Sequence, residues 1–282
     1  MKQIISLIAT VLATITLTNA ELQIIGTGYG RTGTDTLRMA LTTLGYKTYH
    51  MKEIILGSRR QDVIDWKTLI ENDCKDKELL KDIFERGAWD AVLDFPGVMC
   101  WEQLIEIYPN AKVIHTERTS AEKWYESASN SILMIRKLFP FNVINRILPF
   151  WRDHRLMANA MWDKVCGKNV NESDADFPQN VKKDLMAAYD ANNARVREVV
   201  PSERILIQDH GEGWTALANF LGKDIPNEPY PHSNTREEFL DFARRFSYGA
   251  AAVMSVVFLV VIALVKLLLR LRGSSKKKKK AE

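Results

Sequence analysis

Short apolar or β-branched runs alternate along the middle of the chain with longer stretches of helical pattern. Each run is followed by a segment in which apolar residues recur at helical spacing. This alternation is typical of parallel strands joined by helices. We therefore expect an α/β fold with a parallel sheet covered by helices on both faces, and the predicted strands are residues 22–28, 46–51, 89–95, 111–117 and 204–209.

The longest helical stretches lie at residues 53–87, 120–165 and 179–200. The second of them contains an aromatic insertion, "LFPFNVINRILPFW", at residues 138–151. Core packing is the simplest interpretation of this insertion, and the alternatives are the lining of an acceptor pocket or contact with a bilayer.

Both ends of the chain have the composition of membrane-targeting segments. Residues 1–20 carry one early positive charge, an uncharged apolar run and small residues before Ala20, which predicts a secretory signal peptide. A buried N-terminal strand or helix is the other interpretation. Residues 246–265 contain no charge and are long enough to cross about 30 Å of hydrocarbon. We predict a transmembrane helix over 246–269 and a basic cytosolic tail over 270–282.

The charges around this predicted span indicate its orientation. Eight positive residues follow it and two precede it, which places the C-terminus in the cytosol. Lys279 and Lys280 resemble the dilysine address of endoplasmic reticulum residents, and a stop-transfer charge run is the alternative. We expect a single-pass protein of the endoplasmic reticulum or Golgi with a lumenal domain. If residues 1–20 are not cleaved, the chain is tail-anchored and the domain is cytosolic.

Composition narrows the classes of partner. The net charge of +4 comes from the C-terminal cations, and the remaining domain is slightly acidic, so we expect no nucleic-acid binding. Asn171 begins an Asn-Glu-Ser glycosylation acceptor, which fits a lumenal glycoprotein. Cys74, Cys100 and Cys166 lack metal-ligand spacing; one disulfide and one free thiol are compatible with a lumen, and their spacing does not select a pairing.

A glycine-rich turn, "IIGTGYGRTGTDTL" at residues 24–37, joins the first predicted strand to a helix. Backbone N–H groups in such a turn form an anion site. Gly28, Gly30 and Gly33 match a dinucleotide-binding fingerprint, and Glu53 lies at the distance of the ribose-binding acid. Arg31 inside the turn disfavours this interpretation, as does the absence of a further strand in the 35 residues after Glu53.

A nucleotide triphosphatase interpretation also meets difficulties at this turn. Thr34 stands where such enzymes need a lysine, and Asp35 stands where they need the hydroxyl ligand of magnesium. Asp35 is better explained as a first-turn carboxylate that interacts favourably with the helix dipole. Metal-assisted phosphate hydrolysis is therefore not expected.

The loop and four further segments resemble a known family. "RTGT" at 31–34 looks like the 5′-phosphosulfate loop of sulfotransferases, and "YPNAKVIHTERTSAEKWYES" at 108–127 is similar to the segment that binds the nucleotide's 3′-phosphate. Residues 45–51, 94–104 and 213–234 also resemble P-loop sulfotransferases of microbial eukaryotes and invertebrates. The resemblance covers roughly residues 22–240. It implies a P-loop-type domain over 21–243 that moves a sulfuryl group from 3′-phosphoadenosine 5′-phosphosulfate (PAPS) to a hydroxyl or amine.

The resemblance also implies roles for particular residues. Arg31 would face the leaving oxygen, and Arg118 and a serine would hold the 3′-phosphate. The serine usually lies eight residues after the arginine, but Glu126 occupies that position, so Ser127 is the candidate and Ser129 its substitute. No metal is expected, because ligand spacing suggests none. The implied donor-binding residues are Gly28, Tyr29, Gly30, Arg31, Thr32, Gly33, Thr34, Arg118 and Ser127.

A sulfotransferase also needs a base for the acceptor proton. Asp94 ends a strand before "FP", and apolar neighbours would raise its pKa; a helix cap is its alternative role. His50 is the rival base or a substrate contact, and His115 is expected to be a core residue. The acceptor is a small molecule, glycan or lipid. The competing functions are an NAD(P)-dependent oxidoreductase and a non-catalytic nucleotide-binding membrane protein.

Overall fold

The computed structural model describes most of the chain. Its described residues are 21–134, 141–170, 177–208, 213–232 and 236–278. The predicted signal peptide at 1–20 and the predicted glycosylation site at Asn171 lie outside the described residues.

A five-stranded parallel sheet forms the centre of the domain, with the strand order β2-β3-β1-β4-β5. All five predicted strands are confirmed, although each is shorter than its apolar run because the flanking residues leave the ladder for loops. The strands are β1 (Ile24–Gly26), β2 (Thr48–Tyr49), β3 (Ala91–Val92), β4 (Lys112–Thr116) and β5 (Ile205–Gln208).

Successive residues of the central strands point to opposite faces of the sheet, and each face has its own apolar cluster. Ile24 packs with α2 (Thr34–Thr43) and α11 (Gly213–Leu221) on one face. Ile25 packs with the larger cluster on the other face. Helices therefore cover both faces, as predicted. Those of the larger cluster are α4 (Arg60–Glu71), α5 (Lys77–Glu85), α6 (Trp101–Ile107), α7 (Ala121–Ser129), α9 (Pro149–Cys166) and α10 (Lys182–Val199).

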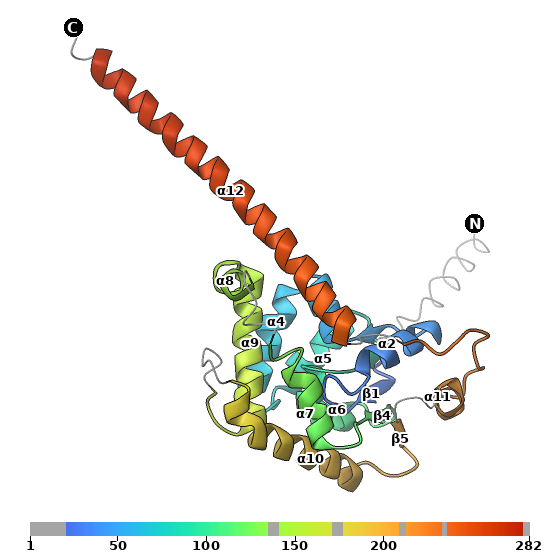
Figure 1. Cartoon of the computed structure of the whole chain (residues 1–282). Helices are drawn as coiled ribbons and strands as arrows, with labels where there is room; N and C mark the ends of the chain where they lie inside the picture. Colours follow the sequence, from blue (N-terminus) through green and yellow to red (C-terminus); the bar gives the residue numbers. More distant parts are fainter. Residues whose placement is uncertain (1–20, 135–140, 171–176, 209–212, 233–235, 279–282) are drawn as a thin grey trace, which may run out of the picture.

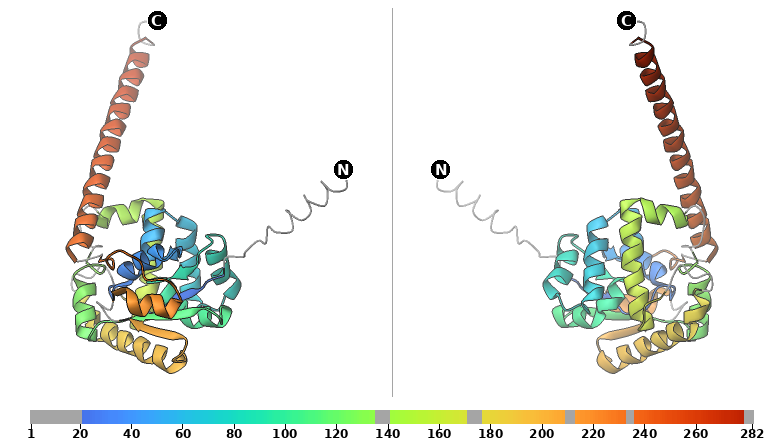
Figure 2. Two further views of the ribbon diagram at one scale, coloured as in Figure 1. Left: turned by 90° about the vertical axis from the view of Figure 1, so that its right-hand side faces the viewer. Right: turned by 90° about the vertical axis from the view of Figure 1, so that its left-hand side faces the viewer.

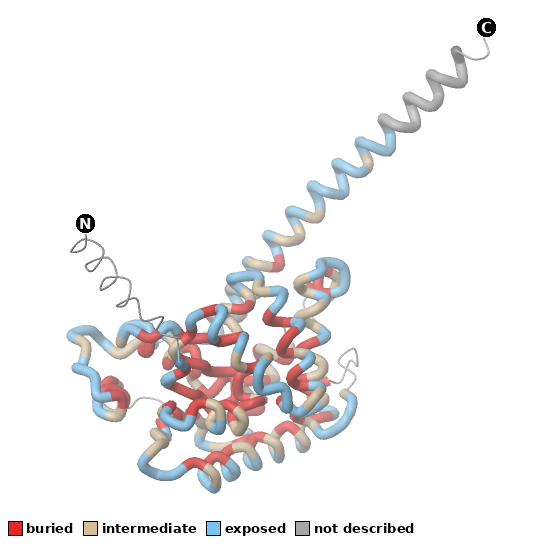
Figure 3. The backbone as a smooth tube through the Cα atoms, turned by 180° about the vertical axis from the view of Figure 1, so that it is seen from behind, coloured by how far each residue is buried: buried red, intermediate tan, exposed pale blue. Residues whose placement is uncertain are grey.

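The shorter elements connect these layers. They are the helices α3 (Met51–Leu56) and α8 (Phe141–Ile147) and the 3₁₀ turns η1 (Gly97–Cys100) and η3 (Gln179–Val181). Figure 1 shows the helices arranged around the sheet, and Figure 3 shows the buried residues concentrated at the centre of the domain. The carboxyl ends of the strands thus open onto loops held between two helical layers.

A disulfide joins Cys74, which follows α4, to Cys100 at the end of η1, and their Cα atoms are 5.6 Å apart. Both cysteines are buried, and Cys166 at the end of α9 is a half-buried free thiol. The bond fixes the end of α4 against the segment that leads into α6. Because that segment follows Asp94 by only a few residues, the crosslink braces the loop after β3.

One long helix, α12 (Arg236–Lys278), leaves the domain at its C-terminal side. Its segment Arg244–Lys266 contains an apolar stretch with a mean hydropathy of 2.6 that is not buried in the domain, although Ser247 near the start of the segment is buried. No other helix among the described residues is long and apolar enough to cross a membrane. The segment's 23 residues span about 34 Å as a helix. The predicted span at 246–269 lies within α12, which projects away from the domain in Figures 1 and 2.

Candidate active site

The glycine-rich loop runs between the carboxyl ends of β3 and β4, and its glycines are required by that close approach. A side chain at Gly28 would collide with Thr116, the last residue of β4. A Cβ at Gly30 would lie 2.5 Å from Oδ1 of Asp94. Gly33, which precedes α2, has a φ of +96°, a conformation that other residues adopt only at a cost. The loop can therefore follow this path only with glycine at these positions.

Two residues of the site that are not glycine also have left-handed backbones. The φ angle is +75° at Arg31 and +68° at Asp94. Such conformations cost roughly 1–3 kcal/mol each and are concentrated at functional sites, where the surrounding structure holds them. The backbone strain therefore marks Arg31 and Asp94 as candidate functional residues.

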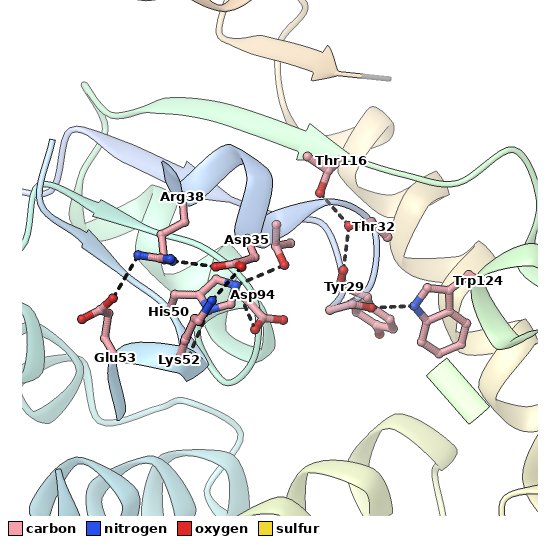
Figure 4. Close-up of polar contacts among 12 residues, drawn as sticks. Tyr29, Thr32, Asp35, Arg38, His50, Lys52, Glu53, Asp94, Thr116 and Trp124 are labelled. Atoms are coloured by element: carbon pink, nitrogen blue, oxygen red, sulfur yellow. Dashed lines mark hydrogen bonds and ion pairs between the residues drawn. The ribbon is translucent and has the colours of Figure 1, made fainter. Parts of the chain in front are cut away.

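Hydrogen bonds from buried side chains fix the loop (Figure 4). Nε1 of Trp124 donates to the carbonyl of Gly30 at 2.9 Å. Oγ1 of Thr32 donates to the carbonyl of Tyr29 at 2.7 Å and lies 2.6 Å from Oγ1 of Thr116. Strand β4 and helix α7 therefore hold the loop in place before any ligand arrives.

Arg31, Arg118 and Ser127, all predicted to bind the donor, lie together. Nε of Arg118 donates to the carbonyl of Arg31 at 2.9 Å, and Nε of Arg31 donates to Oγ of Ser127 at 3.4 Å. Burial and the charge of Arg118 lower the pKa of Arg31. Two guanidinium groups in so confined a space repel one another, and a bound anion would relieve that repulsion.

The surroundings of Arg118 leave it available for a ligand. Among the described residues, its guanidinium forms no ion pair, since the neighbouring carboxylate of Glu117 bonds Arg197 at 2.5 Å. The Arg118 backbone N–H donates to the hydroxyl of Tyr189 at 2.7 Å. An open cavity of about 470 Å³ adjoins it, lined by Glu117, Arg118, Thr119, Ser120, Tyr189, Asp190, Asn193, Ala194 and Arg197.

The two serines considered for this site differ in position. Ser127 meets Arg31, whereas the hydroxyl of Ser129 bonds the carbonyl of Glu126 in its own helix at 3.3 Å. Helix α7 begins after Ser120, whose hydroxyl accepts the backbone N–H of Lys123 as an N-cap. This geometry favours Ser127 over Ser129 as a ligand of a phosphate bound at Arg118.

Asp94 and His50 form a buried pair beside the loop (Figure 4). Nε2 of His50 lies 3.2 Å from Oδ2 of Asp94 and 3.2 Å from Oγ1 of Thr34. Nδ1 of His50 accepts the backbone N–H of Lys52 at 3.1 Å, so His50 caps α3. Because burial lowers the pKa of His50, the ring is neutral and its single proton is on Nε2. His50 therefore donates toward Asp94 and cannot accept a proton there.

The environment of Asp94 suits a base. Burial raises its pKa from 3.8 to about 7, although the Phe95 backbone N–H stabilises the carboxylate. A base with a pKa near the working pH is well matched to proton transfer. Its predicted alternative role as a helix cap is not realised, because Pro96 occupies the N-cap of η1 and no side chain caps that turn.

Two other predicted polar residues have structural partners. His115 is fully buried, with Nδ1 2.9 Å from Oγ1 of Thr27, which confirms it as a core residue. Glu53 pairs with Arg38 at 3.2 Å, and Arg38 also holds the buried Asp35 at 2.8 Å. Strand β3 separates β1 from β2, the strand that leads to Glu53. In dinucleotide-binding folds the corresponding strands are neighbours, so the topology disfavours that interpretation.

Two aromatic residues support the site although no sequence motif assigns them a role. The ring of Tyr189 stacks on Trp124 with centroids 4.9 Å apart, and its hydroxyl holds the Arg118 backbone. Trp124 lies in the segment that resembles sulfotransferases, but its bond to Gly30 has no sequence signal. Tyr189 lies far along the chain in α10, and helical periodicity marks it only as a core residue.

The class of protein follows from this arrangement. A strand, a glycine loop and a helix place backbone N–H groups and two arginines beside a buried carboxylate, as expected of an α/β protein that binds an anionic donor for group transfer. Among the described residues, no group of three metal-ligating side chains is placed to hold a metal ion.

Comparison with known proteins identifies the family. The model of the sulfotransferase domain family matches residues 23–239, and the chain belongs to that family. The chain is also 26% identical over 220 residues to Ava biosynthesis cluster protein M of Aspergillus versicolor. That alignment covers 77% of this chain and 82% of the relative.

Proposed function

We propose that the protein transfers a sulfuryl group from PAPS to a hydroxyl or amine of a small-molecule acceptor, with Asp94 as the base. The observation that carries the proposal is the buried Asp94–His50 pair beside a loop that carries Arg31 and contacts Arg118. In this site Asp94 is suited to remove a proton, and Arg31 and Arg118 are suited to bind anionic oxygens. Membership of the sulfotransferase domain family supports the reaction type.

The donor's charged groups match the basic side of the site. The loop N–H groups and Arg31 would bind the 5′-phosphosulfate, while Arg118 and Ser127 would bind the 3′-phosphate. A planar guanidinium meets phosphate oxygens with two parallel hydrogen bonds, which gives both affinity and orientation. The cavity next to Arg118 would hold part of the nucleoside.

The chemical step needs no metal in this proposal. Asp94 takes the acceptor's proton, the acceptor oxygen or nitrogen bonds to sulfur, and the bond from sulfur to the bridging oxygen breaks. The products are the sulfated acceptor, adenosine 3′,5′-bisphosphate and a proton. Charge that develops on the bridging oxygen is stabilised by Arg31 and the loop N–H groups. His50 orients Asp94 and donates to it, so His50 acts as a positioning residue.

The acceptor class draws on the relative's name. That protein is described as a biosynthesis cluster protein, which supports a small-molecule acceptor for this chain over a glycan. The hydroxyl or amine must reach Asp94, whose side chain is buried next to Phe95 and Val98. We therefore infer an acceptor whose hydroxyl or amine is carried on a narrow or apolar part of the molecule.

We further propose that the domain lies in the lumen of the secretory pathway and that α12 anchors it. The Cys74–Cys100 disulfide supports this location, because such bonds persist in oxidising compartments and are rare in the cytosol. The tail-anchored alternative would place the disulfide in a reducing compartment. A glycosidase-sensitive mass shift that is lost in Asn171→Gln would support the lumenal topology, and a mass that glycosidase does not change would leave the tail-anchored alternative open.

Nucleotide binding tests the donor site without knowledge of the acceptor. The full-length protein in detergent is heated with adenosine 3′,5′-bisphosphate, NAD or NADP, and the unfolding temperature of the domain is measured. A ligand at 100 times its dissociation constant that binds only the folded state adds about 2.7 kcal/mol of stability. We expect this gain with the bisphosphate and none with the nicotinamide nucleotides.

Three variants make this binding measurement specific. Arg118→Ala should weaken bisphosphate binding roughly 10- to 100-fold, since hydrogen bonds to charged groups contribute about 1.5–3 kcal/mol. Arg195→Ala is the control, because Arg195 pairs with Glu102 on the surface and should bind the ligand normally. Stabilisation by NAD or NADP that is lost in Glu53→Ala would overturn the proposal in favour of an oxidoreductase.

A further inference from the structure

A small group of apolar side chains is exposed where α8 meets α9. Ile147 is 63% exposed and Leu148 is 42% exposed, and the half-buried rings of Phe150 and Trp151 follow directly. We call residues 147–151 the α8–α9 tip. Exposed apolar groups that are contiguous mark an interaction surface more often than isolated ones do.

The α8–α9 tip contacts the base of α12. The ring of Trp151 lies 4.9 Å from that of Phe246, and Phe141 of α8 lies 6.2 Å from Phe246. The segment able to cross a membrane begins at Arg244, so these rings meet α12 at the start of the span. Figure 2 shows α8 lying across the domain beside the base of α12.

The end of α3 belongs to the same side of the domain. Leu56, its last residue, is 60% exposed, and α4 begins four residues later at Arg60. Nε of Arg60 pairs with Oδ2 of Asp153 in the first turns of α9 at 2.7 Å. This ion pair holds the start of α4 against the start of α9. Leu56 therefore lies on the side of the domain that carries the α8–α9 tip.

We propose that the α8–α9 tip and Leu56 insert into the interfacial layer of the bilayer that α12 spans. Trp151, which contacts α12 at the start of the span, is of a residue type that is enriched at membrane interfaces. Arg146, exposed next to Ile147, forms no ion pair among the described residues and would meet lipid phosphates. Lipid is the occupant that this geometry favours, because the contacts with Phe246 hold the tip where the span must enter the membrane.

This docking has a consequence for the acceptor, which rests on the proposed function. Helix α3 starts after His50 and ends at Leu56, and its six residues extend about 9 Å. Insertion of Leu56 would bring the membrane within that distance of the Asp94–His50 pair. The acceptor would then be a membrane-soluble alcohol or amine that reaches Asp94 from the bilayer. The docking itself requires α12 to span the membrane and does not require transferase activity.

Depth-dependent fluorescence quenching tests the docking in the full-length protein. In a Cys166→Ser background, single cysteines replace Leu56, Ile147, Ser202 or Tyr248, and each variant is labelled with an environment-sensitive dye. The proteins are reconstituted into phospholipid vesicles with or without lipids brominated on the acyl chains. Ser202 is exposed at the amino end of β5 and serves as the unquenched control, while Tyr248 lies within the span and is the quenched control.

The proposal predicts strong loss of emission at positions 56 and 147, comparable with position 248, and no loss at position 202. Equal emission at 56, 147 and 202 with quenching at 248 would overturn it, since the domain would then stand clear of the bilayer. Labels shielded from aqueous iodide but unquenched by brominated lipid would also overturn it, because a second copy of the chain would then cover the tip. Nucleotide binding is measured on the same samples, so that failure of the docking is distinguished from failure of the donor site.

Discussion

Replacement of Asp94 by asparagine should inactivate the enzyme and at the same time stabilise the fold. The substitution keeps the size of the side chain, tolerates the positive φ of +68° and retains an oxygen that can accept the proton on His50 Nε2. It removes only the charge and the ability to take a proton. Loss of a general base costs about 10²- to 10⁴-fold in turnover.

The gain in stability follows from the raised pKa of Asp94. A rise from 3.8 to about 7 corresponds to roughly 4 kcal/mol at about 1.4 kcal/mol per pH unit. Between these values the folded state holds a proton that the unfolded state has released, so the stability of the wild type falls as the pH rises from about 4 to about 7. The asparagine variant has no such loss. Its advantage should be absent near pH 4 and complete above pH 7.

Thermal unfolding of the two full-length proteins across this pH range measures the difference. A domain of this size gains about 2–4 °C per kcal/mol, so the asparagine variant should unfold roughly 8–16 °C higher at pH 8. Asp90→Asn, at a half-buried carboxylate that accepts hydrogen bonds from Gln23 Nε2 and from the Lys47 backbone N–H, is the matched control and is measured over the same pH range. The reasoning is refuted if the Asp94 variant shows the same difference from wild type at pH 5 and pH 8.

Four further variants test the site and the disulfide beside it. Gly30→Ala should lower turnover roughly 100-fold and also weaken bisphosphate binding measured by titration, because its methyl group would displace Asp94 and shift the loop whose N–H groups bind the donor. His50→Asn keeps a cap for α3 but is too short to donate to Asp94. Loss of that donor should raise the pKa of Asp94, so the acid limb of the pH–rate profile should move to higher pH. His50→Gln retains the donor but loses the cap, which should cost about 1 kcal/mol of stability. An unmoved acid limb in the asparagine variant would show that His50 does not tune Asp94. Replacing both Cys74 and Cys100 by serine should cost roughly 3.5 kcal/mol in chemical denaturation, from the 26-residue separation of the crosslinked positions, and an unchanged midpoint would mean that the crosslink is absent.

The sequence predicted the layers of the fold because each strand is short, apolar and followed by a helical pattern. It could not predict that β3 lies between β1 and β2, since strand order depends on long-range packing of the two apolar clusters. That order is what separates Glu53 from β1. The sequence also did not predict how short the strands are, because residues 22–28 have the composition of a longer strand although only Ile24–Gly26 pairs.

The candidate site was predictable as far as local motifs reach. The loop, Arg118 and Asp94 are adjacent to strand ends, and parallel strands bring such ends together. The choice between Asp94 and His50 was not predictable, because it depends on which ring nitrogen accepts the Lys52 N–H. The support that Tyr189 gives to Arg118 comes from residues 71 positions apart and has no local pattern.

Transfer of labelled sulfate is the most direct test of the account. Full-length wild type and Asp94→Asn, reconstituted in vesicles, are incubated with ³⁵S-labelled PAPS and a panel of membrane-soluble and water-soluble alcohols and amines. The account predicts that label moves to at least one acceptor with wild type, in step with release of adenosine 3′,5′-bisphosphate, and that the asparagine variant binds the bisphosphate but transfers no label. Equal transfer by both proteins would contradict the role of Asp94. Stabilisation of wild type by the bisphosphate without transfer to any acceptor would instead indicate a nucleotide-binding membrane protein that has lost catalysis.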